Sequence, residues 1–238
     1  MKNIPKILLA TPISNIKNYI IWHYFDWIKQ LTYPNLDFLF VDNSRDENFH
    51  KEVTRRTGFE CLYLPPEKDE SIRVFMCRCN NLIRDIFLKR KHDFLFSLEC
   101  DLICALNTIE HLLSLHKKVV GLPYFIHHSY YSKILMMRYE DFGAERMLKN
   151  LSIDEGFLFF DGKVKETSQI GIGCLLIHKS ILEKLEFRVE LNEDSHADTY
   201  FHRDLKEKLN EKAYIDTRYI AFHYNGNWTK IYQNVGHN

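Results

Sequence analysis

Short runs of consecutive apolar residues alternate with longer amphipathic segments through the first half of the chain. Such runs are typical of strands buried on both faces of a sheet, and the longer segments have the apolar spacing of helices. The predicted strands cover residues 6–10, 37–41, 60–64, 93–98 and 119–124. The predicted helices cover residues 19–31, 49–57, 72–89 and 108–115. This alternation predicts an α/β fold, with a mostly parallel central sheet flanked by helices on both faces.

The second half of the chain is mixed rather than strictly alternating. Strand-like segments are predicted at residues 130–139, 172–178, 214–215 and 220–222, and an amphipathic helix at residues 197–212. A hairpin is predicted over residues 158–165, turning at Asp161-Gly162. The sequence contains no internal repeat, and no linker separates the two halves. We therefore expect one domain over residues 1–238, built from a regular half (1–125) and an elaborated half (126–238).

Composition and charge narrow the class of protein. Of the 238 residues, 45% are hydrophobic and 27% charged, which excludes disordered and low-complexity chains. Lys plus Arg (32) balance Asp plus Glu (32), so no strong overall field attracts nucleic acid or an anionic membrane. The apolar run at residues 7–10 is shorter than the core of a signal peptide, and no run is long enough to cross a membrane. We expect a cytoplasmic protein without stable membrane insertion.

Cysteine usage leaves three interpretations. The six cysteines are Cys61, Cys77, Cys79, Cys100, Cys104 and Cys174. Three disulfides are possible by number, but a chain of this size without a secretion signal favours reduced thiols. A zinc site is the other alternative, in which the 77/79 and 100/104 pairs converge. Neither pair has the usual separation of two residues, so reduced thiols are the favoured interpretation.

Acidic residues mark the ends of two predicted strands. Glu99 and Asp101 follow the strand at 93–98, and Asp42 follows the strand at 37–41. Ligands of parallel sheets bind beyond the carboxyl ends of the strands. Two carboxylates this close favour a hard divalent cation, which needs few other protein ligands when a substrate phosphate completes its shell. The alternative is that both are solvated turn residues.

Two arginines extend this predicted site. Arg73 and Arg78 lie near the start of the long helix, where guanidinium groups are suited to a diphosphate or a base. Either arginine alone is more often a solvated surface group. Together with the strand-end carboxylates, they predict a pocket for a nucleotide whose phosphate is bridged by a metal ion.

Five segments, in order along most of the chain, resemble the GT-A glycosyltransferases of the family-2-like group. They are Ile7-Leu8-Leu9-Ala10-Thr11-Pro12, Phe40-Val41-Asp42-Asn43-Ser44, Phe96-Ser97-Leu98-Glu99-Cys100-Asp101, Ile170-Gly171-Ile172-Gly173-Cys174, and Asp198-Thr199-Tyr200-Phe201 with the downstream His223. The resemblance implies the GT-A fold, with nucleotide binding in residues 1–125 and acceptor binding in residues 126–238.

The resemblance also implies roles for individual residues. Mn²⁺ or Mg²⁺ would be held by Asp101, by Glu99, which is alternatively placed toward the ribose, and by His223. The nucleoside would lie against Thr11, Pro12 and Asp42, and the sugar or acceptor beside Gly171 and Gly173. Asp198 would be the catalytic base of an inverting enzyme. The motifs depart from the family twice, because Glu-x-Asp replaces Asp-x-Asp and Ala197 precedes Asp198, so Asp194 is an alternative base.

The sequence therefore predicts a metal-dependent transfer of a sugar from a nucleotide-sugar donor to an acceptor hydroxyl. The acceptor is unknown, with a glycan or a hydroxymethylated DNA base as candidates. A nucleotidyltransferase is one alternative, although the residues after the first strand lack a glycine- and arginine-rich loop for a triphosphate. A nucleotide-sugar-binding module without catalysis is the other.

Overall fold

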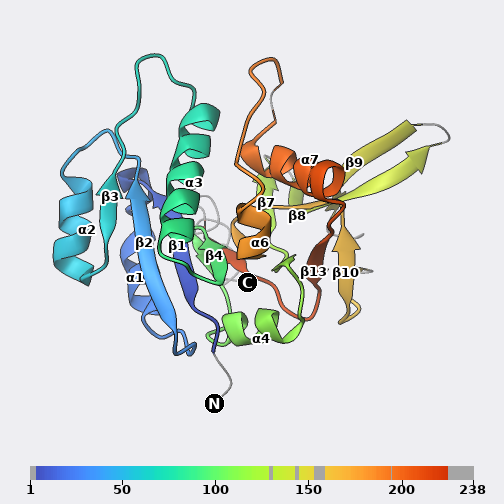
Figure 1. Cartoon of the computed structure of the whole chain (residues 1–238), viewed down its shortest axis with the longest axis horizontal. Helices are drawn as coiled ribbons and strands as arrows, with labels where there is room; N and C mark the ends of the chain where they lie inside the picture. Colours follow the sequence, from blue (N-terminus) through green and yellow to red (C-terminus); the bar gives the residue numbers. More distant parts are fainter. Residues whose placement is uncertain (1–3, 129–130, 143–144, 153–158, 194, 225–238) are drawn as a thin grey trace, which may run out of the picture.

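A computed structural model describes residues 4–128, 131–142, 145–152, 159–193 and 195–224 of the chain. Its centre is an eight-stranded sheet with helices packed on both faces (Figure 1). From one edge to the other, the strands are β10 (Val164–Thr167), β13 (Ala213–Asp216), β6 (Val119–Gly121), β12 (Cys174–His178), β4 (Phe94–Leu98), β1 (Ile7–Ile13), β2 (Leu36–Asp42) and β3 (Cys61–Tyr63).

The sheet is mostly parallel, as the sequence predicts. Strands β1, β2, β3 and β4 run in one direction, and β12 and β10 are antiparallel to their neighbours. The order changes direction at β1, which pairs with β2 on one side and with β4 on the other. A crevice opens at such a point, beyond the carboxyl ends of the strands, and it is where sheets of this type bind ligands.

The residues of β1 alternate between the two faces of the sheet. Ile7 and Leu9 belong to the core on one face, which is covered by α1 (Ile21–Ile28), α2 (Phe49–Thr57) and α4 (Thr108–Ser114). Leu8 and Ala10 belong to the core on the other face, which is covered by α3 (Ile72–Lys89), α6 (Lys179–Leu182) and α7 (Ala197–Leu209). Burial on both faces explains why these strands appear as continuous apolar runs in the sequence.

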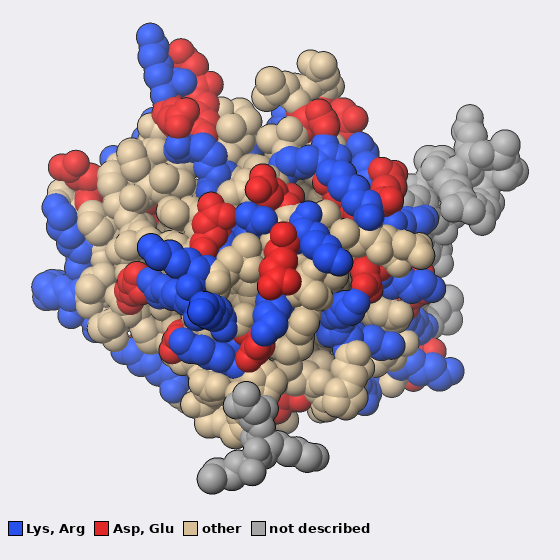
Figure 2. All heavy atoms as spheres, viewed as in Figure 1, with Lys and Arg blue, Asp and Glu red and all other residues tan. Residues whose placement is uncertain are grey.

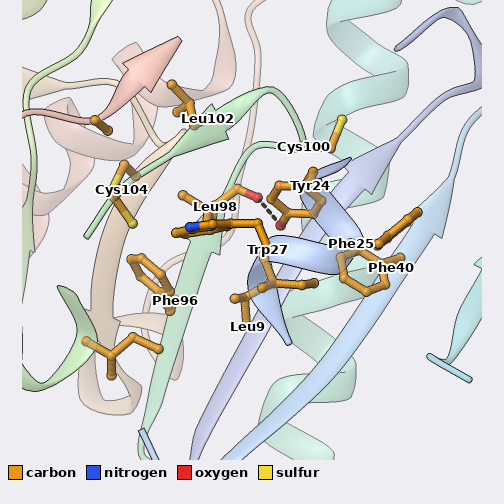
Figure 3. Packing of buried hydrophobic residues seen from close by; sticks show 14 of the residues in the cluster. Leu9, Tyr24, Phe25, Trp27, Phe40, Phe96, Leu98, Cys100, Leu102 and Cys104 are labelled. Atoms are coloured by element: carbon orange, nitrogen blue, oxygen red, sulfur yellow. Dashed lines mark hydrogen bonds between the residues drawn. The ribbon is translucent and has the colours of Figure 1, made fainter. Parts of the chain in front are cut away.

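Helix α1 is fixed to the end of β4 by a buried tyrosine. The Tyr24 hydroxyl donates a hydrogen bond of 2.9 Å to the carbonyl oxygen of Leu98, among the packed rings of Phe25 and Phe40 (Figure 3). A buried hydroxyl without a partner is costly, so this bond sets the position of α1 against the strand. The next residue after Leu98 is Glu99, and the backbone of the predicted site is thereby anchored.

Strands of the elaborated half take part in two further sheets. One joins β7 (Phe125–His128), β8 (Tyr131–Phe142), β9 (Glu145–Ser152) and β11 (Gln169–Ile170), and its β8–β9 hairpin projects from the main sheet (Figure 1). The other pairs β5 (Leu102–Ile103) with β14 (Phe222–His223).

Two predictions for this half differ from the structure. The predicted hairpin over 158–165 is wrong for its described part, because β10 pairs with β13 instead of folding back on residues 159–160. The helix predicted over 197–212 ends at Leu209, because Asn210 adopts the left-handed conformation that closes a helix.

The surface carries basic and acidic side chains interleaved, as the face in Figure 2 shows. Residues 89–91, the compact basic segment of the sequence, lie at the end of α3, and Arg90 forms two hydrogen bonds with Glu60, of 2.7 and 2.8 Å. Among the described helices, none is long and apolar enough to cross a membrane.

Candidate functional site

A cavity of about 610 Å³ lies at the carboxyl ends of β1, β2 and β4. Its wall combines residues 11–17, which end β1 and follow it, residues 43 and 45 after β2, the start of α3, and residues 97 and 99–101 at the end of β4 and just after it. Four residues predicted from the sequence line it, namely Thr11, Pro12, Glu99 and Asp101. The volume lies in the range of pockets that hold a small ligand.

Glu99, Asp101 and His223 converge beside this cavity. Each offers one ligand atom, and these atoms lie within 4.8 Å of one another. The convergence depends on the small β5–β14 ladder, which pairs His223 with Leu102 and so brings it next to Asp101. The backbone N–H of Tyr224 also donates to the carbonyl oxygen of Asp101 at 2.7 Å. The structure therefore brings together the three residues that the sequence assigned to a metal.

The imidazole of His223 is oriented by its two neighbours. Nδ1 lies 2.9 Å from the carbonyl oxygen of Phe125, and Nε2 lies 3.3 Å from Oδ2 of Asp101. Because a carbonyl oxygen only accepts, Nδ1 carries a proton, and Nε2 is the atom left for a metal ion or for a hydrogen bond to Asp101. Burial is the largest influence and opposes protonation of His223, but the hydrogen bond and charge of Asp101, together with the hydrogen bond to Phe125 and the charge of Glu99, raise the pKa of the imidazole overall.

The two carboxyl groups have opposite electrostatic environments. Burial and then the charge of Asp101 raise the pKa of Glu99 to about 7. Burial also disfavours the charge of Asp101, but hydrogen bonding from His223 and the charge of Lys17 lower its pKa overall. The side chain of Asp101 is only 3% exposed, and Oδ2 accepts from the Lys17 ammonium. The pair thus lacks enough positive charge to ionise both carboxyl groups easily, and a divalent cation would supply it.

Asp42 lies outside the cavity wall. It is fully buried at the end of β2, and its Oδ1 accepts a 2.8 Å hydrogen bond from the backbone N–H of Ser44. The Ser44 hydroxyl in turn accepts from the N–H of Asn15 at 2.8 Å. Asp42 therefore supports the two loops that line the cavity, and its predicted contact with a nucleoside stays a prediction.

Neither Arg73 nor Arg78 lines the cavity. Arg78 forms an ion pair with Glu70 at 2.7 Å and also bonds to Pro65 and Glu67, so it braces the segment before α3. Arg73 donates to the backbone carbonyls of residues 193 and 195, at 3.0 Å for the latter. In the structure these guanidinium groups bind loops near the cavity, and their predicted contact with a diphosphate stays a prediction.

Asp198 lies in the first turn of α7, partly buried. Its charge is among the influences that raise the pKa values of Glu99 and Tyr124, although burial is the largest one for both. The charge of Asp198 therefore acts on the cluster, although Asp198 does not line the cavity. Asp194, the alternative base, lies outside the described residues.

Gly171 and Gly173 precede β12, which is antiparallel to β4. The backbone N–H of Glu99 donates to the carbonyl oxygen of Gly173 at 2.8 Å. A Cβ atom at Gly173 would lie 2.7 Å from the Tyr124 hydroxyl and 2.8 Å from Cδ of Glu99. Gly173 therefore permits the close approach of buried side chains. This packing role is separate from the predicted role of leaving space for a sugar. Gly171 is buried two residues earlier.

Replacing Gly173 with alanine is expected to lower the free energy of unfolding by about 1–3 kcal/mol, because the methyl group would displace Glu99 or Tyr124. Denaturant titration measures this loss. Gly58→Ala is the matched control, since its Cβ would meet nothing within 4 Å and only its φ of +77° opposes alanine. We expect about 1 kcal/mol for that strain. Equal stability of Gly173→Ala and the wild type would contradict the close contact.

Two cationic residues of the cavity wall were missed by sequence reasoning. Lys17 follows β1 in the short helix η1 (Asn15–Lys17), and Arg45 follows β2. Arg45 is exposed, and the described part of the chain contains no ion-pair partner for it. Both residues lie in the segments that follow buried strands, and this position is the one sequence signal that could have identified them. Basic residues are common in loops, so that signal is weak.

No protein-family model matches the sequence, and no curated protein resembles it significantly. Among solved structures, GalNAc-T7 with UDP, GalNAc and Mn²⁺ is similar, with a TM-score of 0.64 and 12% identity over 94% of this chain. This chain matches 44% of that one, which is less than half of its length. A197 from STIV has a TM-score of 0.48 and 14% identity, over 92% of this chain and 86% of that chain. The first likeness shows the fold, which is that of the GT-A glycosyltransferases.

Proposed function

We propose that the chain is a metal-dependent glycosyltransferase that moves a sugar from a nucleoside-diphosphate sugar to an acceptor hydroxyl. The observation that carries the proposal is the convergence of Glu99, Asp101 and His223 at the wall of a cavity at the carboxyl edge of the sheet. The solved structure with the similar fold contains UDP and Mn²⁺, which supports the same class of donor here.

The three side chains fit Mn²⁺ or Mg²⁺. Carboxylate oxygens suit both ions, and an imidazole nitrogen is better suited to Mn²⁺. Nδ1 of His223 donates a hydrogen bond to Phe125, so Nε2 is the ring nitrogen that would coordinate the metal ion, as in other metal-binding histidines. The high pKa of Glu99, about 7, reflects a buried pair of carboxyl groups that lacks positive charge. A divalent ion bound there would stabilise the charge that develops on the leaving diphosphate.

Different residues of the cavity wall are proposed to bind the nucleoside and the diphosphate of the donor. Thr11 and Pro12 line the cavity at the carboxyl end of β1, where the nucleoside is proposed to lie. Arg45 and Lys17 offer positive charge on the same wall, and charge-assisted hydrogen bonds to phosphate oxygens are among the strongest that side chains form. The donor's diphosphate is therefore proposed to lie beside these cations, next to the metal site at Asp101.

Asp198 is proposed as the base that takes the proton from the acceptor hydroxyl. A hydroxyl is a poor nucleophile until a carboxylate accepts its proton during the attack. The acceptor is proposed to enter from the elaborated half, past α7 and Gly171. A glycan hydroxyl and the hydroxyl of a hydroxymethylated base are both consistent with this chemistry.

Thermal unfolding with a panel of UDP- and GDP-sugars tests the donor class. A bound donor at about a hundred times its Kd should raise Tm by roughly 5–10 °C in the presence of Mn²⁺, and EDTA should remove the shift. Release of free sugar from that donor is the second measurement. Binding without sugar release would favour a nucleotide-sugar-binding module, and pyrophosphate release from nucleoside triphosphates would favour a nucleotidyltransferase. Absence of any shift across the panel would contradict the proposal.

A further inference from the structure

Lys17 supplies a positive charge beside the carboxyl groups of Glu99 and Asp101. Its ammonium donates to Oδ2 of Asp101 from the short helix η1 that follows β1. The carboxyl group of Asp101 is 3% exposed, whereas the Lys17 side chain is 33% exposed and lines the cavity. The ion pair therefore joins a buried anion to a partly exposed cation at the cavity wall.

Lys17 shares its acceptor atom with the cluster that would hold a metal. Oδ2 of Asp101 also lies 3.3 Å from Nε2 of His223 and accepts a hydrogen bond of 3.4 Å from the hydroxyl of Tyr19. An ammonium in contact with this oxygen repels a divalent cation bound at the same atom, and the repulsion is strong in a buried site. Lys17 and the metal ion therefore compete for Asp101.

We propose that Lys17 neutralises Asp101 in the ligand-free protein and moves to the donor's diphosphate when a divalent cation takes its place. This inference rests on the proposed function and adds a donor-binding residue to it. The long, unbranched side chain of lysine is a mobile point charge, which is suited to exchanging one anion for another. The diphosphate is proposed to lie beside Asp101, in the cavity that Lys17 lines. The Lys17 ammonium would therefore pair with a phosphate oxygen after it leaves Asp101.

Arg45 provides the contrast. It lines the same cavity, but it has no ion pair with Asp101 or with another described acid. Removing its charge would weaken nucleotide binding without relieving competition at the metal site. The two cations are thus expected to behave differently toward the metal ion and similarly toward the diphosphate.

Isothermal titration of wild type and Lys17→Gln tests the exchange, first with Mn²⁺ alone and then with UDP at saturating Mn²⁺. We expect Lys17→Gln to bind Mn²⁺ about tenfold more tightly and UDP about tenfold more weakly. Opposite changes cannot arise from partial unfolding, which would weaken both. Arg45→Gln is the matched control, with unchanged Mn²⁺ affinity and weaker UDP binding. Lys17→Arg should keep the low Mn²⁺ affinity of the wild type.

The outcomes separate this inference from the proposed function. Equal or weaker Mn²⁺ binding by Lys17→Gln overturns the competition, and unchanged UDP affinity overturns the move to the diphosphate, while a metal-dependent enzyme remains in both cases. Tighter Mn²⁺ binding by Arg45→Gln as well would mean a general effect of charge and would overturn a specific role for Lys17. Failure of every variant to bind Mn²⁺ overturns the metal-dependent function itself.

Discussion

Replacing Asp101 with asparagine is expected to lower Mn²⁺-dependent release of sugar from a nucleotide-sugar donor by at least about a thousandfold. Asparagine keeps the shape of the side chain but removes the negative charge that holds the cation. Asp101 is buried and accepts from Lys17, Tyr19 and His223, so its carboxylate is the centre of the cluster. Initial rates at saturating donor, with Mn²⁺ varied, measure both the loss of turnover and the loss of metal affinity.

Loss of stability must be separated from loss of the metal site, because Asp101→Asn leaves the Lys17 charge without its partner. Asp204→Asn is the matched control. The side chain of Asp204 is likewise 3% exposed and is paired with Arg188 and Lys208, at 2.8 and 2.9 Å, but it does not line the cavity. We expect this variant to lose stability and to retain turnover. Wild-type rates in Asp101→Asn would show that the cation, if needed, binds elsewhere.

The regular half of the fold was predictable because its physical signals are local. Strands β1, β2 and β4 are buried on both faces, so each appears in the sequence as an apolar run that ends at a polar residue. Parallel strands bring these ends to one edge of the sheet. That rule alone predicted that Glu99 and Asp101 lie near the ligand-binding edge. The cap of α3 at Ser71 and the closing Gly58 of α2 are similarly local.

The remainder depends on contacts between distant segments. His223 reaches Asp101 only through the pairing of β14 with β5, two strands of two residues each, and such short ladders have no sequence signature. Here the resemblance to a family predicted a residue that periodicity did not. Asp42 and Arg78 fit the pattern of site residues, but their actual partners are Ser44 and Glu70. Residue type and strand position alone do not distinguish a side chain that supports a loop from one that faces the cavity.

Asp198→Asn is expected to lower the turnover number by about 10²–10⁴-fold while leaving donor affinity unchanged. Asp198 lies in the first turn of α7, where the helix N-terminus favours a negative charge, and Oδ1 accepts from the N–H of Thr199 at 2.8 Å. Within the described part of the chain the other carboxylate oxygen accepts no hydrogen bond, so it is proposed to take the proton from the acceptor. Single-turnover release of sugar measures the chemical step, and titration of the donor measures binding.

The comparison with Asp194→Asn decides which aspartate is the base. Loss of turnover in Asp198→Asn alone assigns the role to the residue whose charge already influences Glu99. Loss in Asp194→Asn alone assigns it to the other acid and leaves Asp198 as a helix-terminal residue. Full activity in both variants would argue against a carboxylate base, because an inverting transfer needs a proton acceptor opposite the leaving diphosphate. Retention of the donor's anomeric configuration in the released sugar, followed by NMR, would then be the expected companion result.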